Sequence, residues 1–243
     1  GNTRTRDEVL RRELRQMEAG WFSTEQLNNS RDRLRRLGYF DDVTIETPAV
    51  AGSTDEVDIN VKVEEKASGN FLAGLGYSQS DGIIFNTSIT QDNFLGTGKR
   101  VSLAFNNSSA NRLYQLAYTN PYYTIDGVSR GFNLSYRSTD FAELSTADYL
   151  LDVGRAGVNF GFPINDRARY GFNIDYEYTK VKPGGDPSLE IEDFVEQNGE
   201  TFHDFKLGGS WAYDTRDTSV FATRGIDHVA SVRASVPGSD LQY

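Results

Sequence analysis

Between residues 69 and 237 the chain alternates apolar and polar side chains in nine successive segments. In the first segment, Phe71, Ala73, Leu75 and Tyr77 hold one parity, while glycines and more polar residues dominate the other. A side-chain period of two is the signature of a β-strand whose two faces meet different surroundings. The period recurs at 83–89, 101–105, 114–118, 132–136, 158–162, 170–178, 205–213 and 226–232. The pattern therefore predicts nine strands with one apolar, aromatic face.

The second face of these segments distinguishes a membrane barrel from a soluble sandwich. It is rich in polar and charged residues, which line water, among them Arg100, Asn106, Gln115, Arg137, Asn173, Glu177 and Lys206. Strands of about nine to eleven residues, tilted by about 45°, cross the hydrocarbon core of a bilayer. Tight connections at 124–128 and 165–166 alternate with longer polar ones at 138–150 and 183–199, as in outer-membrane barrels. Residues 67–243 are therefore predicted to form an antiparallel transmembrane β-barrel fragment.

Residues 1–66 follow a helical period first. Thr5 and Glu8 have the spacing of a capping box. Apolar residues then fall near helical spacing at Leu10, Leu14, Met17 and Trp21. Ser23 and Gln26 repeat the capping pattern, and Leu27, Leu34 and Leu37 continue an apolar stripe. Gly38 is placed to end this second helix.

Two short alternating segments follow, at 43–47 and 57–63, with a turn at 51–53. The result is a small α+β domain of order ααββ over residues 1–66. Its core is thin, so a further strand ahead of Gly1 is expected. Because Gly1 is preceded by no initiator methionine or signal peptide, the chain is expected to begin inside the mature protein. Nine strands are likewise expected to be only part of a barrel wall.

Composition changes this interpretation little. The net charge is −10, 37% of residues are hydrophobic and there is no cysteine. The mean hydropathy is −0.54, and no run of residues has the length and apolarity of a transmembrane helix. No basic patch indicates nucleic-acid binding.

Candidate chemistry is sparse. Residues 95–99 lack the full spacing of a phosphate-binding loop and enter a predicted strand rather than a helix. His203 and His228 stand in neither metal-ligand nor triad spacing. The remaining charged groups are interpreted as rim charges (Asp214, Arg216, Asp217) and as a solvated acidic loop (Glu190, Glu192, Asp193, Glu196). We therefore expect no catalytic site, no metal site and no cofactor, and hence not an enzyme.

Four stretches carry a family resemblance. Gly38, Tyr39 and Phe40, between a predicted helix and strand, resemble the turn of a POTRA domain, a periplasmic module of order βααββ. The strand-turn sequences at 91–98, 119–128 and 161–165 resemble the BamA family of outer-membrane β-barrel assembly factors. The resemblance covers the whole chain, as a last POTRA domain followed by about the first half of the barrel.

This resemblance implies an insertase that folds other β-barrel proteins and inserts them into the bacterial outer membrane, with the POTRA domain in the periplasm. Its implied partners are nascent outer-membrane β-barrel proteins, accessory lipoproteins such as BamD, and outer-membrane lipid. Two alternatives stay open. One is a POTRA-barrel secretion transporter, TamA-like or of the two-partner type; the other, less favoured, is a passive porin.

The first barrel strand is the candidate site. Gly69, Gly74 and Gly76 lie in or beside it, and glycine weakens a strand by about 0.5–1 kcal/mol relative to alanine. We expect this strand to pair transiently with the last strand of the same barrel and to act as a lateral gate that opens and pairs with client strands through its backbone. The alternative is that it is an ordinary part of the wall, in which the glycines merely bend the sheet. The predicted pairing residues are Asn70, Phe71, Leu72, Ala73, Gly74, Leu75, Gly76, Tyr77, Ser78 and Gln79.

A second candidate lies on the first predicted helix. Arg11, Arg15 and Glu18 are spaced to form a charged stripe opposite the apolar face. Solvated helix surface explains such a stripe, and so does docking of an accessory lipoprotein, the role that the resemblance implies for this domain with BamD.

Overall fold

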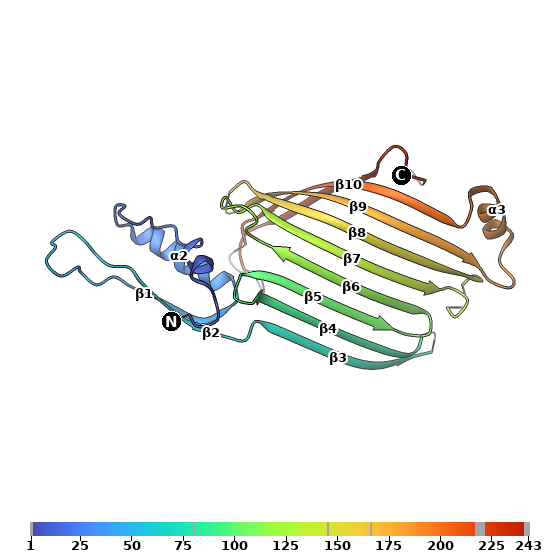
Figure 1. Ribbon diagram of the computed structural model, residues 1–243, viewed down its shortest axis with the longest axis horizontal. Helices are drawn as coiled ribbons and strands as arrows, with labels where there is room; N and C mark the ends of the chain where they lie inside the picture. Colours follow the sequence, from blue (N-terminus) through green and yellow to red (C-terminus); the bar gives the residue numbers. More distant parts are fainter. Residues whose placement is uncertain (1, 80, 145, 166, 217–221, 241–243) are drawn as a thin grey trace. The chain divides into compact units, whose positions relative to one another are not determined.

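The computed structural model describes residues 2–79, 81–144, 146–165, 167–216 and 222–240. The chain divides into two compact units (Figure 1). The first unit comprises Gly1–Asn70 together with Gln91–Arg100, and the second comprises Phe71–Thr90 with Val101–Tyr243. The turn at 91–100 therefore belongs with the N-terminal residues, although the chain reaches it only after the first barrel strand.

The first unit contains two helices and two strands in the described residues: α1 (Asp7–Arg11), α2 (Thr24–Arg36), β1 (Phe40–Glu46) and β2 (Asn60–Glu65). β1 and β2 pair antiparallel, with Val43 opposite Val63. Both helices pack apolar side chains against this pair. The resulting core consists of Val9, Leu10, Leu34, Tyr39, Phe40, Val43 and Val63.

Helix α2 forms as its sequence predicts. The Ser23 hydroxyl accepts a hydrogen bond from the Gln26 N–H at 3.3 Å, which satisfies one of the free donors of the first turn. Gly38 follows the helix with a φ of +75°, a left-handed conformation that glycine adopts without steric cost. Both boundary predictions are confirmed.

Helix α1 is much shorter than predicted, because it ends at Arg11, and its presumed cap has other partners. The Thr5 hydroxyl accepts from the Asn93 side-chain amide at 2.8 Å, and the Thr5 N–H donates to the Glu65 carboxylate at 2.6 Å. The helix starts after Arg6 without a side-chain cap. The prediction that Met17 and Trp21 continue its apolar face was wrong, since the two residues are 79% and 98% exposed.

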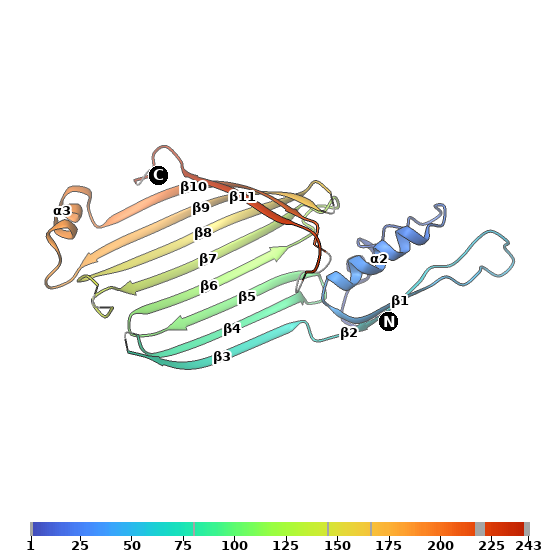
Figure 2. The same cartoon turned by 180° about the vertical axis from the view of Figure 1, so that it is seen from behind.

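The second unit is built on a nine-stranded sheet in the described residues, in the order β11-β10-β9-β8-β7-β6-β5-β4-β3. Figures 1 and 2 show the strands following one another across the sheet in chain order. The strands are β3 (Gly69–Ser78), β4 (Gly82–Phe94), β5 (Lys99–Asn107), β6 (Asn111–Asn120), β7 (Ser129–Asp140), β8 (Tyr149–Pro163), β9 (Ala168–Pro183), β10 (Thr201–Asp214) and β11 (Asp227–Ser235). The prediction of nine strands is confirmed, with the last beginning just after Ile226. β3 and β11 form the two edges.

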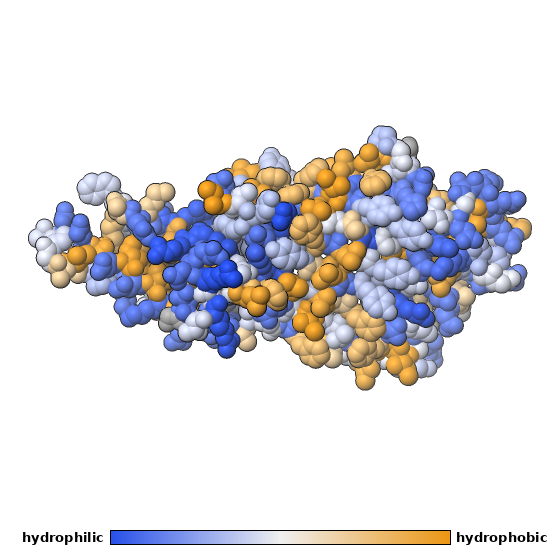
Figure 3. Space-filling model, viewed as in Figure 1, coloured by the Kyte–Doolittle hydropathy of each residue, from blue (hydrophilic) through white to orange (hydrophobic). Residues whose placement is uncertain are grey.

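One face of the sheet is apolar and uncovered. Leu134 and Phe205, for example, are 55% and 52% exposed, although they lie on interior strands. Phe105 and Tyr176, at the centre of the same face, are also partly exposed. Figure 3 shows hydrophobic residues, in orange, gathered over β3 to β5. An apolar face without a protein cover is what a wall in contact with lipid requires.

The opposite face is polar, and glycines alternate with polar side chains across its strands. Gly157 lies between Asn133 and Asp175 in the antiparallel register of β7, β8 and β9. A Cβ atom on Gly157 would come within 2.0 Å of Asp175 Oδ1. In the next row, Glu177 binds Lys206 at 2.8 Å and also pairs with Arg155. This face is therefore held together in part by ion pairs between side chains of neighbouring strands.

The connections follow the predicted alternation only in part. The β7–β8 and β9–β10 connections are long, and the second carries helix α3 (Leu189–Asn198). However, β3–β4 and β5–β6 turn on the same rim within a few residues, and β10–β11 spans 215–226 on the other rim. Asp166, in the predicted 165–166 turn, lies outside the described residues.

Candidate functional site

Strand β3 is the candidate site, and it is an edge strand. It pairs with β4 on one side, and no other strand of the described residues lies beyond it. Every residue of β3 except Ser78 is exposed. An edge strand presents a row of unpaired N–H and C=O groups, which can hydrogen-bond to another strand.

The side chains of β3 add little to its hold on the sheet. A Cβ atom added to Gly74 would have no neighbouring atom within 4 Å, and one added to Gly76 would meet only Ile84 Cβ, at 3.9 Å. Thr87 Oγ1, on β4, donates to the Leu72 carbonyl at 3.1 Å. With two side-chain-free positions at its centre, β3 depends on backbone hydrogen bonds more than a fully packed strand does.

The beginning of β3 has both backbone and side-chain contacts with β4. The Ser68 carbonyl accepts a hydrogen bond from the Asp92 N–H at 2.9 Å, and the Ser68 hydroxyl accepts one from the Gln91 side-chain amide, also at 2.9 Å. Gly69 and Asn70 are accordingly part of the first unit, whereas Phe71 onward belongs to the sheet. Of the ten predicted pairing residues, Asn70 thus lies in the fixed base, and Gln79 lies just beyond the strand.

The turn at 91–100 is fastened to the N-terminal residues by contacts that sequence reasoning missed. The Arg6 N–H donates to the Gly96 carbonyl at 2.9 Å, and the Tyr39 hydroxyl donates to the Gly98 carbonyl at 3.3 Å. Gly96 has a φ of +72°, and its α-carbon approaches the backbone of Arg4 so closely that no side chain fits. A glycine-rich turn between two strands was the only feature of the sequence that hinted at this approach.

Glu65 binds the N-terminal segment at the same place. Its carboxylate accepts backbone N–H groups from Thr3 and Arg4, each at 2.9 Å, and from Thr5 at 2.6 Å. Burial by itself would raise the pKa of this carboxyl. The hydrogen bonds have the larger, opposite effect, and together they lower the pKa from an ordinary 4.5 to about 2. A cavity of about 460 Å³ lies beside it, lined by Arg4, Tyr39, Lys66 and Gln91 among others. Burial, and then the charge of Asp92, raises the pKa of Tyr39.

The three residues of the predicted charged stripe do not share a helix, because α1 ends at Arg11. All three are nevertheless exposed. Arg11 Nη1 lies 2.7 Å from Glu18 Oε1, and the Arg15 backbone N–H donates to Ser30 Oγ at 2.8 Å. The structure therefore pairs Arg11 with Glu18 through a turn rather than along a helix face.

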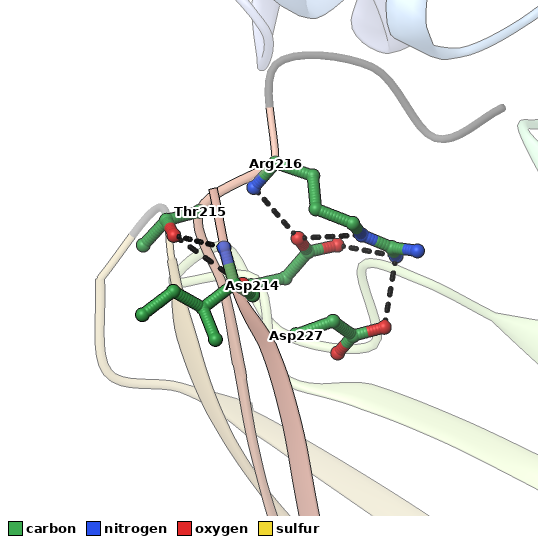
Figure 4. Close-up of polar contacts among 5 residues, drawn as sticks. Asp214, Thr215, Arg216 and Asp227 are labelled. Atoms are coloured by element: carbon green, nitrogen blue, oxygen red, sulfur yellow. Dashed lines mark hydrogen bonds and ion pairs between the residues drawn. The ribbon is translucent and has the colours of Figure 1, made fainter. Parts of the chain in front are cut away.

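The predicted rim charges form a clasp between β10 and β11 (Figure 4). Arg216 Nη2 lies 2.8 Å from Asp214 Oδ2 and 3.1 Å from Asp227 Oδ2. Asp217 lies outside the described residues. The acidic residues of α3 are exposed, and no group of three or more His, Asp or Glu side chains in the described part of the chain could hold a metal ion. These charges fasten a hairpin and offer no catalytic arrangement.

Together, the α+β unit and the sheet with one uncovered apolar face define a class: a soluble module joined to the wall of a membrane β-barrel. The family model for the Omp85 superfamily domain matches residues 93–243. The model for POTRA, the surface antigen variable number repeat, matches residues 1–66. The chain belongs to the Omp85 superfamily, and the predicted fold class is confirmed.

Similar proteins carry consistent names. The outer membrane protein assembly factor BamA of Neisseria meningitidis serogroup B is 33% identical over 100% of this chain and 32% of that protein. The BamA of Buchnera aphidicola is 22% identical over 99% of this chain and 36% of that protein. The chain thus spans about a third of the length of these curated relatives. The family and these relatives identify the location as the bacterial outer membrane.

Solved structures agree with the fold. BamA from Haemophilus ducreyi lacking POTRA domains 1–3 superposes with a TM-score of 0.73 at 31% identity, over 97% of this chain and 47% of that one. CdiB from Acinetobacter baumannii, at 15% identity and a TM-score of 0.59, covers 99% of this chain and 45% of that one, and shares the fold. No helix in the described residues is long and apolar enough to cross a membrane.

Proposed function

We propose that the protein folds other β-barrel proteins and inserts them into the outer membrane, with β3 as the edge on which client strands are templated. The observation that carries this proposal is the pair of glycines at the centre of β3, Gly74 and Gly76, where an added side chain would meet almost nothing, in a chain of the Omp85 superfamily. Named relatives are outer membrane protein assembly factors, which supports assembly as the activity.

The physical argument rests on backbone hydrogen bonds. In hydrocarbon each unsatisfied N–H or C=O costs several kcal/mol, so a client strand gains most by pairing before its own barrel closes. Strand addition to an open edge supplies that pairing, with little dependence on the side chains of the client. β3 suits this role because it offers a full strand length with glycine at its centre.

The fixed base of β3 gives the templating strand a defined origin. Ser68 and the turn at 91–100 hold its first residues, while residues 71–78 lie beyond those contacts. We expect the free length to separate from its closing partner and the base to stay in place, so that clients add in a constant register.

Site-directed photocrosslinking tests the template. A photoreactive residue replaces Leu72 on β3, and the matched control replaces Leu113 on the interior strand β6. Both are leucines of the polar-face parity, but only Leu72 lies at an edge. Stalled client barrels should crosslink to position 72 at several times the yield at position 113. Equal yields would exclude β3 as the template.

Depletion in living cells tests the wider activity. Loss of many unrelated outer-membrane barrels is the expected result for an assembly factor. Loss of a single exported protein would instead indicate a secretion transporter, and loss of small-solute uptake alone would indicate a porin.

The exposed pair of Arg11 and Glu18, together with Arg15, is the proposed docking surface for an accessory lipoprotein, for which the family resemblance implies BamD. Glu18→Arg should weaken lipoprotein pull-down, because it places two cations where the 2.7 Å ion pair stood. The double variant Arg11→Glu with Glu18→Arg restores the pair in reverse and separates docking from local stability. Unchanged pull-down by both variants would remove this surface from the proposal.

A further inference from the structure

The apolar face of the sheet is not uniformly ridged, because β8 carries small residues where its neighbours carry large ones. Gly154 lies between Tyr136 on β7 and Tyr178 on β9, and Ala156 lies in the next outward-facing row. A Cβ on Gly154 would find its nearest neighbour, Tyr178 Cδ1, only at 3.8 Å. The surface is therefore low over Gly154 and Ala156 of β8 and higher over the tyrosines of the strands on either side.

This arrangement forms the floor of a depression on the apolar face, which we call the furrow and which crosses strands β4 to β9. Its main part is a depression of about 690 Å³, lined almost wholly by apolar atoms of strands β4 to β9. A second depression of about 400 Å³ continues it toward Val158. The two share Leu116, Leu134, Ala156 and Tyr176, so they form one continuous groove.

One end of the furrow meets a group of charged side chains at the rim of the long connections. In the row beyond Gly154, Asp152 lies between Ser138 and Lys180, and Arg112 is opposite Ser138. Asp152 is already matched by Lys182, whose Nζ lies 2.6 Å from Oδ2. Lys180 lies 3.7 Å from Glu200, and the side chain of Arg112 is exposed.

A lipid is the occupant that fits both parts. Lipid tails are as apolar as leucine, so burial alone does not favour one tail over another. A tail that follows the furrow gains dispersion contacts that an unfilled depression would lose. Long connections lie on the extracellular side of such barrels, so the lipid belongs to the outer leaflet, and a phosphate on its headgroup would meet Arg112 and Lys180.

We propose that this furrow binds one acyl chain of a phosphorylated glycolipid of the outer leaflet, with its phosphate at Arg112 and Lys180. The site lies on interior strands and does not involve β3, so it is independent of strand templating. Occupancy of the furrow would give the wall a fixed lipid neighbour beside β8.

Native mass spectrometry of the full-length protein in detergent tests the site, with hexa-acylated lipid A as the probe and no client present. Ala156→Leu fills the floor, whereas Ala230→Leu makes the same change on the same face of β11, outside the furrow. We expect Ala156→Leu to lower lipid A affinity about tenfold and Ala230→Leu to leave it unchanged.

A second variant keeps the outcome interpretable if Ala156→Leu disturbs folding, which heat-modifiable gel mobility reports. Arg112→Gln with Lys180→Gln leaves the wall unchanged and should also lower lipid A affinity about tenfold. Equal affinity of wild type and both furrow variants would overturn the site. Phosphatidylglycerol bound as tightly as lipid A would overturn the assignment to a glycolipid.

Discussion

Replacing Glu65 by glutamine should loosen the N-terminal segment of the first unit. The carboxylate accepts three consecutive backbone N–H groups and the Thr3 hydroxyl, all within 3 Å. A neutral amide has one acceptor oxygen and introduces donors of its own, so it cannot replace these bonds. The result is a loss of charge-assisted hydrogen bonds at a position that ties residues 3–5 to the end of β2.

The pKa gives the magnitude. A fall from 4.5 to about 2 corresponds to about 3 kcal/mol at most, and solvent exposure reduces this to about 1 kcal/mol. Because the folded-state pKa is depressed, the stabilisation is fully present above about pH 4.5 and is lost as the pH falls toward 2. At pH 7 the Glu65→Gln variant is therefore less stable than the wild type, and the two converge near pH 2.

Hydrogen exchange at the amides of residues 3–5, in the full-length protein, measures this local opening. Exchange in Glu65→Gln should be about fivefold faster at pH 7, after correction for intrinsic rates. Glu64→Gln is the matched control, because Glu64 is the exposed neighbour on the same strand. Equal protection in the wild type and Glu65→Gln at pH 7, or a difference that persists at pH 2, would refute the reasoning.

Three further changes test the packing of the two units. Gly96→Ala should destabilise the first unit by about 3 kcal/mol, measured by limited proteolysis, because it adds a backbone clash to a positive φ; Gly52→Ala, with an equally positive φ but open space, should cost only about 1 kcal/mol. Gly157→Ala should destabilise the sheet by about 1–3 kcal/mol through overpacking, and so lower the temperature at which the folded gel band disappears. Gly154→Ala, on the opposite face of the same strand, should leave that temperature unchanged. Lys206→Met should cost about 1–3 kcal/mol in the same assay, because it leaves a largely buried carboxylate with one cation instead of two.

The sheet could be predicted from sequence because each of its strands meets lipid on one side and water on the other. The face on which a residue such as Leu134 or Asn133 lies can therefore be predicted from that residue's own polarity, without information about the neighbouring strands. Helix α2 was predictable for a similar reason, since Ser23 and Gly38 act within their own turns.

The contacts of the first unit could not be predicted in this way, since they join distant residues. Thr5 has the local spacing of a helix cap, but it bonds Asn93, which is 88 positions along the chain. A single sequence gives local preference, and these partners are settled only by tertiary structure.

The glycines of the polar face impose a rule on how this wall can change over evolutionary time. A Cβ at Gly157 would displace the carboxylate of Asp175, and a Cβ at Gly208 would displace the side-chain amide of Asn173. Extra bulk on one strand is therefore accommodated most easily when the facing residue on the adjacent strand becomes smaller. Among related chains, substitutions at the two positions of such a pair should therefore occur together. Positions on the lipid-facing side should change independently of one another.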